Sequence, residues 1–109
     1  MLTKQFRFNL REETDFFDKC KKVHSPYFSF FYKPSENFQV TIIVSKKVLK
    51  LATKRNSTKR IYRQAIQSNL DNLIKFKIKL VIVVHTQGTM LSVSEIAQQI
   101  EKNVQKIRI

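Results

Sequence analysis

One stretch of the chain constrains the fold more than any other, because it combines a strong positive charge with core-like residues. Residues 45–64 contain eight Lys or Arg and no Asp or Glu, and the whole of 37–70 lacks an acidic residue. Within this stretch Ile61, Ala65 and Ile66 recur at the spacing of one helix face. The pattern predicts an amphipathic helix that packs one side on a core and presents a cationic side outward.

The unbalanced charge of this helix indicates a polyanionic partner. No carboxylate lies three or four residues from Lys59 or Arg63 to offset their mutual repulsion. Lys54 and Arg55 fall near the expected helix start, where the helix dipole disfavours cations. Phosphate reverses both penalties, because exposed N–H groups at a helix N-terminus also bind anions. The net charge of +13 agrees with RNA or DNA, and the helix lacks the free apolar face that a membrane surface requires.

Composition limits the size and location of the protein. A chain of 109 residues, 42% of them hydrophobic, is expected to form one globular domain over 1–109. Cys20 is the single cysteine, which excludes an internal disulfide and a zinc site built on cysteines. The N-terminus has no apolar segment typical of a signal peptide, and the longest apolar run, 80–84, is too short to cross a bilayer. We therefore expect a cytoplasmic protein without a membrane partner.

Local patterns predict an α+β order of elements. They indicate a helix over roughly 10–21, an aromatic strand over 26–34 and a β-branched strand over 38–45. A short turn separates the two strands, so we expect them to pair as an antiparallel hairpin. After the basic helix, residues 78–85 form a nearly continuous apolar strand, typical of a central buried position. The order predicts one sheet packed against a layer of helices.

The last helix has the clearest start. Ser92 and Glu95 match a capping box, and Leu91 and Ile96 occupy the two positions of a hydrophobic staple. A helical apolar stripe follows, made of Val93, Ile96, Ala97, Ile100, Val104 and Ile107.

The aromatic strand offers a second candidate surface. Alternation divides its side chains between the faces of the sheet: Tyr27, Phe31 and Lys33 on one, and Phe28, Phe30 and Tyr32 on the other. One face has to build the core against the helices. An aromatic set left on the other face would stack unpaired bases, as in single-strand binders. Burial of both faces is the alternative interpretation.

The basic segment resembles a motif of the protein subunit of bacterial ribonuclease P. That family has a Ser-Lys-Lys strand end, a short basic connection, and Arg-Asn-Arg-x-x-Lys-Arg-x-x-Arg at the start of a helix. The matching residues are Val44, Ser45, Lys46, Lys47, Val48, Ala52, Arg55, Asn56, Lys59, Arg60 and Arg63. Flanking elements agree in kind and order, so the resemblance covers about residues 10–107. Ser57 replaces the third residue of Arg-Asn-Arg, which indicates a divergent member.

The resemblance implies an αβββαβα sandwich with one mixed sheet of about four strands and three helices. It also implies a ribonucleoprotein whose RNA subunit cuts the 5′ leader from precursor tRNA, with Mg²⁺ held mainly by the RNA. The expected partners are ribonuclease P catalytic RNA and precursor tRNA, with no obligate protein partner evident. The polypeptide itself is then expected to contribute neither catalytic residues nor metal ligands.

Carried over onto this chain, the resemblance implies two groups of site residues. The RNA-binding group is Lys46, Lys47, Lys50, Lys54, Arg55, Asn56, Lys59, Arg60 and Arg63. The group expected in a cleft for the leader is Phe16, Phe17 and Phe31, for which a plain core role is the alternative interpretation.

Two other functions compete with this interpretation of the residues. A ribosomal-protein-like binder of structured RNA, with no role in tRNA processing, fits the basic helix equally well. A nuclease that acts through its own side chains is disfavoured, because two-metal phosphoryl chemistry needs clustered carboxylates. The acidic residues Asp15, Asp18 and Asp71 and the two histidines, His24 and His85, are scattered along the chain.

Overall fold

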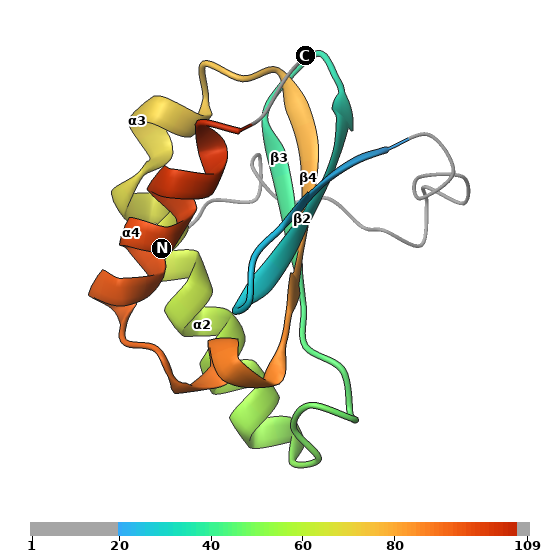
Figure 1. Cartoon of the computed structure of the whole chain (residues 1–109), viewed down its shortest axis with the longest axis vertical. Coiled ribbons are helices and arrows are strands. Elements are labelled where there is room, and N and C mark those ends of the chain that lie inside the picture. Colours follow the sequence, from blue (N-terminus) through green and yellow to red (C-terminus); the bar gives the residue numbers. More distant parts are fainter. Residues whose placement is uncertain (1–19, 107–109) are drawn as a thin grey trace.

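A computed structural model of the chain describes residues 20–106 and shows a sheet covered on one face by helices (Figure 1). The strands are β1 (Lys21–His24), β2 (Phe28–Pro34), β3 (Gln39–Ile43) and β4 (Ile78–Val84). The helices are α2 (Ala52–Ser68), α3 (Leu70–Leu73) and α4 (Val93–Val104), with a 3₁₀ helix, η3 (Thr86–Met90), before α4. The predicted two-layer α+β architecture with a mixed four-stranded sheet is confirmed. The helix predicted over 10–21 lies outside the described residues except at its end, where Lys21 already belongs to β1.

None of the helices within residues 20–106 has the length and apolar character needed to cross a membrane.

The strand order β1-β2-β4-β3 corrects one expectation from the sequence. β2 and β3 were predicted to form a hairpin, but each pairs with β4 instead, β2 antiparallel and β3 parallel. The hairpin prediction was wrong because a short loop permits strand pairing but does not require it. β4 is the most apolar strand, with five of seven residues buried, so it gains most from neighbours on both edges. Its predicted central position is confirmed.

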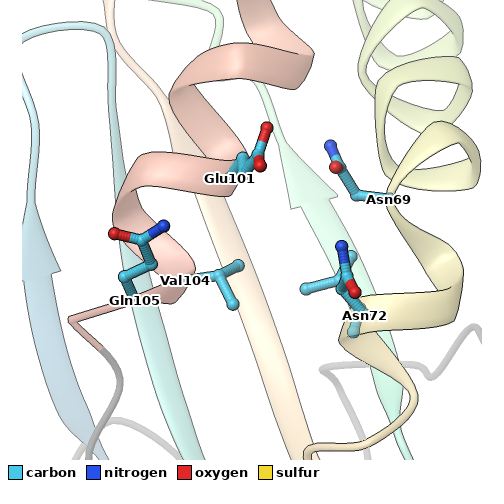
Figure 2. Close-up of a pocket in the computed structure, with 6 residues that line it drawn as sticks. Asn69, Asn72, Glu101, Val104 and Gln105 are labelled. Carbon is cyan, nitrogen blue, oxygen red and sulfur yellow. The ribbon is translucent and has the colours of Figure 1, made fainter.

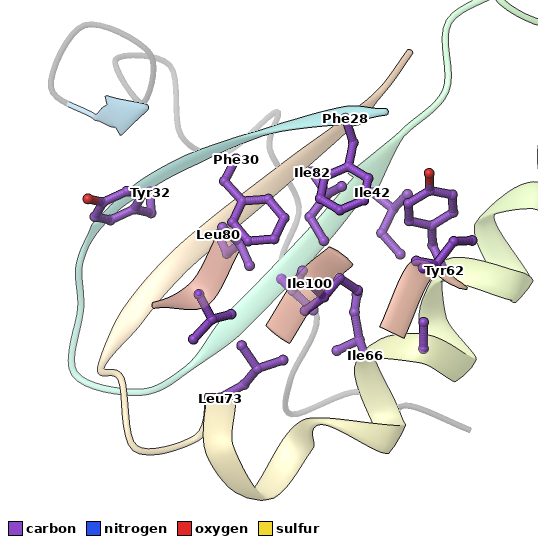
Figure 3. Close-up of a cluster of buried hydrophobic side chains, with 14 of the residues drawn as sticks. Phe28, Phe30, Tyr32, Ile42, Tyr62, Ile66, Leu73, Leu80, Ile82 and Ile100 are labelled. Carbon is purple, nitrogen blue, oxygen red and sulfur yellow. The ribbon is translucent and has the colours of Figure 1, made fainter. Parts of the chain in front are cut away.

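The core lies between the sheet and the helices (Figure 3). The rings of Phe28 and Phe30 stack with centroids 5.3 Å apart, and Tyr62 meets Phe28 edge-on at 5.7 Å. Tyr62, Ala65 and Ile66 are fully buried, which confirms the predicted inner face of the basic helix. Burying a side chain of this size contributes about 2 kcal/mol, so this face fixes the orientation of α2 on the sheet.

The predicted start of α4 is confirmed in detail. The Ser92 hydroxyl accepts a hydrogen bond from the Glu95 amide at 3.3 Å, and the Glu95 carboxylate accepts one from the Ser92 amide at 3.2 Å. Ile96, Ile100 and Val104 are buried against the sheet, whereas Ile107 lies outside the described residues.

The substitution Ser92→Ala removes this cap and should lower the free energy of unfolding by about 1 kcal/mol, because an amide of the first turn loses its acceptor. Urea denaturation followed by circular dichroism measures the change. Ser94→Ala is the control, since Ser94 is exposed on the same helix and has no capping role. An equal effect of both substitutions would contradict the assignment of the cap.

Candidate nucleic-acid interface

The outer surface of α2 and the connection that precedes it carry all nine cationic or polar residues predicted to bind RNA. We call this the basic surface: Lys46, Lys47 and Lys50 from the connection, and Lys54, Arg55, Asn56, Lys59, Arg60 and Arg63 from α2. Six of them are exposed, and Arg55, Lys59 and Arg63 are partly buried. The connection loops beyond the sheet and leads into the first turn of α2 (Figure 1). The structure therefore gathers these residues in one region while Tyr62 and Ile66 anchor the helix.

Among the described residues, no side chain caps the peptide N–H groups in the first turn of α2. The residue at the N-cap is Leu51, whose side chain cannot accept a hydrogen bond, and the first turn contains no acidic residue. Unsatisfied N–H groups at a helix start carry partial positive charge. Lys54 lies in the same turn, so backbone and side chain both favour an anion there.

Arg55 has a structural role that the sequence did not reveal. Its Nη1 atom donates hydrogen bonds to the carbonyl oxygens of Leu49, at 3.0 Å, and Lys50, at 2.8 Å. One guanidinium group therefore ties the connection to the first turn of α2. Because Lys50 belongs to the tied segment, Arg55 positions part of the basic surface in addition to contributing charge.

The substitution Arg55→Ala should loosen the connection and lower RNA affinity together. Loss of two charge-assisted hydrogen bonds, about 1–2 kcal/mol locally, should raise amide hydrogen exchange in residues 49–51 about tenfold. RNA affinity should fall by about the same factor. Arg60→Ala is the matched control: it removes the same charge from an exposed position and should weaken RNA binding without changing exchange. Unchanged exchange in the Arg55 variant would show that the two bonds do not hold the connection.

Ser57 occupies the position at which the resembling motif has its third arginine. Its hydroxyl donates to the Thr53 carbonyl at 3.0 Å, one turn earlier in the same helix. The side chain is exposed, so the basic surface lacks one cation at this point without any gap in packing.

The aromatic strand presents Phe31 on the face of the sheet that lies away from α2 and α4. Phe28, Phe30 and Tyr32 build the helix-side core, so alternation directs Phe31 to the other face (Figure 3). Its ring is partly exposed, and the Lys22 ammonium lies 5.0 Å from the ring centroid. A cation beside a ring is a suitable neighbour for a stacked base and its phosphate. Phe16 and Phe17, also predicted for the leader cleft, lie outside the described residues.

A cluster on that same face joins the two histidines of the chain. The Ser29 hydroxyl lies 2.8 Å from His85 Nε2 and 3.3 Å from His24 Nδ1, and Ser29 is only 1% exposed. His24 lies five residues from Ser29, but His85 lies 56 residues away, and the sequence treats each histidine as isolated. Only the strand register, which sets His24 opposite Ser29, brings them together.

Acidic residues are dispersed over the described part of the chain. Within residues 20–106 no group of three or more His, Cys, Asp or Glu is placed to hold a metal ion.

A small pocket of about 250 Å³ opens between the α2–α3 junction and the end of α4 (Figure 2). Asn69, at the C-terminus of α2, donates to the carbonyl oxygens of Ala65 and Ala97 and so joins the two helices. Amide side chains and the carboxylate of Glu101 line the opening. A carboxylate disfavours phosphate, so this pocket is not part of the basic surface.

Together, the fold and the charge define a class of protein: a small α+β sandwich in which the helix between two parallel strands carries a cationic outer face. Comparison with known proteins identifies a family within this class. The family model described as Ribonuclease P matches residues 2–108. The ribonuclease P protein component of Acinetobacter baylyi is 33% identical over 89 residues, which cover 80% of this chain and 66% of the relative, just under two thirds of its length.

Solved structures agree on the fold. The ribonuclease P protein of Thermotoga maritima matches with a TM-score of 0.82 at 19% identity, covering 94% of this chain and 98% of the other. That of Staphylococcus aureus gives 0.77 at 17% identity, covering 93% and 94%. The chain belongs to the ribonuclease P protein family, which confirms the resemblance drawn from residues 44–63.

Proposed function

We propose that this protein is the protein component of a ribonuclease P ribonucleoprotein and assists 5′ maturation of tRNA in the cytoplasm. The observation that carries the proposal is the basic surface, an acid-free cationic helix face with an open N-terminus on a ribonuclease P family fold. The catalytic RNA binds this surface through its phosphates. The relatives bear the name of the same component, which supports the assignment.

The proposed mechanism is positional and electrostatic. Lysine and arginine side chains neutralise RNA phosphates and release their counterions, so affinity depends steeply on salt. The ring of Phe31, with Lys22 beside it, receives the single-stranded leader on the face of the sheet away from α2 and α4. Mature tRNA has no leader and cannot make the contact with Phe31, so the protein binds precursor tRNA more tightly than mature tRNA. Mg²⁺ held by the RNA would supply charge neutralisation at the scissile phosphate.

Reconstitution tests this function. Added to ribonuclease P RNA at low Mg²⁺, the protein should restore cleavage of precursor tRNA, and it should bind precursor more tightly than mature tRNA. A plot of log affinity against log salt should have a negative slope of several units. Tight RNA binding without any effect on cleavage would instead favour a binder of structured RNA of the ribosomal-protein type.

A further inference from the structure

A second cationic cavity lies at the edge of the sheet, apart from the basic surface. This cleft, of about 650 Å³, separates the turn after β1 from the second half of α4. The end of β1 contributes His24 and the turn contributes Tyr27. The second half of α4 and the residues just after it contribute Gln99, Lys102, Asn103 and Lys106. We call it the α4 cleft. Its volume is in the range of sites that hold a small ligand or a nucleotide unit.

The lining of the α4 cleft favours an anion with an attached ring. Lys102 and Lys106 are exposed and four residues apart on one side of the chain, so both ammonium groups reach the same space. Among residues 20–106, no carboxylate lines the cleft. Glu101 instead borders the pocket on the other side of α4 and is directed toward Asn69 (Figure 2). Tyr27 adds a half-buried aromatic wall, and amide side chains add hydrogen-bonding groups.

His24 is held in place by the cluster described above. A hydroxyl has a single hydrogen, so Ser29 donates to one imidazole and accepts from the other. In both arrangements His24 Nδ1 is engaged by Ser29, while Nε2 has no partner among the residues that the structure describes. A ring fixed in this way loses little freedom when it binds a ligand.

The same histidine links the cleft to the face that carries Phe31. Lys22 lies opposite Phe31, and His24 lies opposite Ser29, two residues further along the same strands. Two residues of a strand span about 7 Å. An RNA strand that stacks on Phe31 can therefore continue past His24 to Lys102 and Lys106.

We propose that the α4 cleft binds single-stranded RNA, taking the continuation of the strand whose base stacks on Phe31. Lys102 and Lys106 neutralise a phosphodiester, His24 contacts it through Nε2, and Tyr27 receives a base. This inference rests on the proposed function and extends its leader site to α4, so the length of leader that contributes affinity is set by this cleft.

Imidazole NMR provides a direct test, because the chain has two histidines and both belong to this cluster. Titration of the full chain with oligouridylate should shift the His24 signals. In the variant Lys102→Gln/Lys106→Gln the shifts should be lost and oligouridylate affinity should fall about tenfold. Lys75→Gln/Lys77→Gln, which removes two exposed charges at another site, should change neither the His24 shifts nor the oligouridylate affinity. Amide spectra establish that each variant is folded.

Leader length gives the functional readout. The reconstituted enzyme should bind precursor tRNA with a long leader more tightly than precursor tRNA with a short leader. Lys102→Gln/Lys106→Gln should abolish this difference in affinity and leave the affinity for the short-leader precursor unchanged. Tyr27→Leu should weaken oligouridylate binding while leaving inorganic phosphate binding unchanged.

The contradicting outcomes separate the two proposals. If oligouridylate shifts the amide signals of α2 but leaves the imidazole signals unchanged, the cleft proposal is overturned and the proposed function remains intact. Equal imidazole shifts with phosphate alone would reduce the cleft to an anion site and also overturn it. Failure of the wild-type protein to activate the RNA would overturn the proposed function itself.

Discussion

Replacing Lys59 and Arg60 together by glutamine should lower the affinity for ribonuclease P RNA by about a hundredfold, roughly 3 kcal/mol. Both side chains belong to the basic surface, and each charge-assisted contact with phosphate contributes about 1–2 kcal/mol. Fold stability should change little, because Arg60 is exposed, Lys59 is partly exposed, and the core contacts of α2 come from Tyr62, Ala65 and Ile66. Filter binding or fluorescence anisotropy at several salt concentrations measures the loss.

The matched control is Lys75→Gln/Lys77→Gln, which makes the same change in net charge at exposed positions between α3 and β4. That connection lies at the opposite end of the molecule from the start of α2 (Figure 1). The α2 variant should reduce the steepness of the salt dependence by about 1.5 units, and the control should not. Equal losses in both variants would mean that net charge alone, rather than the basic surface, governs binding.

The substitution Gly88→Ala should destabilise the fold by about 3 kcal/mol, or about 15 °C in Tm. Gly88 has an ordinary φ angle, so the requirement is for space. A methyl group there would collide with the Tyr27 carbonyl oxygen and lie 2.6 Å from the Tyr62 hydroxyl. The Tyr27 carbonyl accepts the His85 amide at 3.0 Å and cannot easily retreat. Differential scanning calorimetry provides the measurement.

Two further variants make the Gly88 prediction specific. Gln87→Ala, at an exposed neighbour in η3, should leave Tm unchanged. Tyr62→Phe removes a buried hydrogen bond of 2.9 Å to the Gly88 carbonyl and should cost about 1–2 kcal/mol. Burial raises the pKa of Tyr62 well above its ordinary value, so the phenol stays neutral and remains a donor. Combining Tyr62→Phe with Gly88→Ala should not rescue stability, because the backbone clash with Tyr27 persists. A rescue would show that the hydroxyl was the true obstacle.

Features encoded by local spacing were predictable from the sequence. The two faces of α2 follow from the helical spacing of Ile61, Ala65 and Ile66 against the basic residues, and the Ser92–Glu95 cap follows from a short motif. The basic surface was also predictable, since its residues are contiguous in the chain and α2 keeps them together. The α+β order of elements also followed from local patterns, and the motif resemblance added the αβββαβα arrangement.

Features that depend on residues distant in the chain were not predictable. The pairing of β2 with β4 instead of β3 depends on competition between whole strands for burial. The contact of Ser29 with His85 spans 56 residues and requires the register of β2 against β4. The hydrogen bonds of Arg55 to backbone carbonyl oxygens were not predictable either. The sequence of a basic segment does not distinguish a cation that faces solvent from one that binds carbonyl oxygens.

The central position of β4 also determines when this protein can fold during its synthesis. Within residues 20–106, β3 pairs with no strand other than β4, so a nascent chain that has not yet released residue 84 from the ribosome holds, of the described pairings, only that of β1 with β2. α2 by then has emerged, with its cations and its apolar side both uncovered. Translation that stops before β4 therefore yields a basic fragment that cannot form this sheet. Completion of the chain lets β4 pair with both β2 and β3 and gives the apolar side of α2 the surface on which it packs.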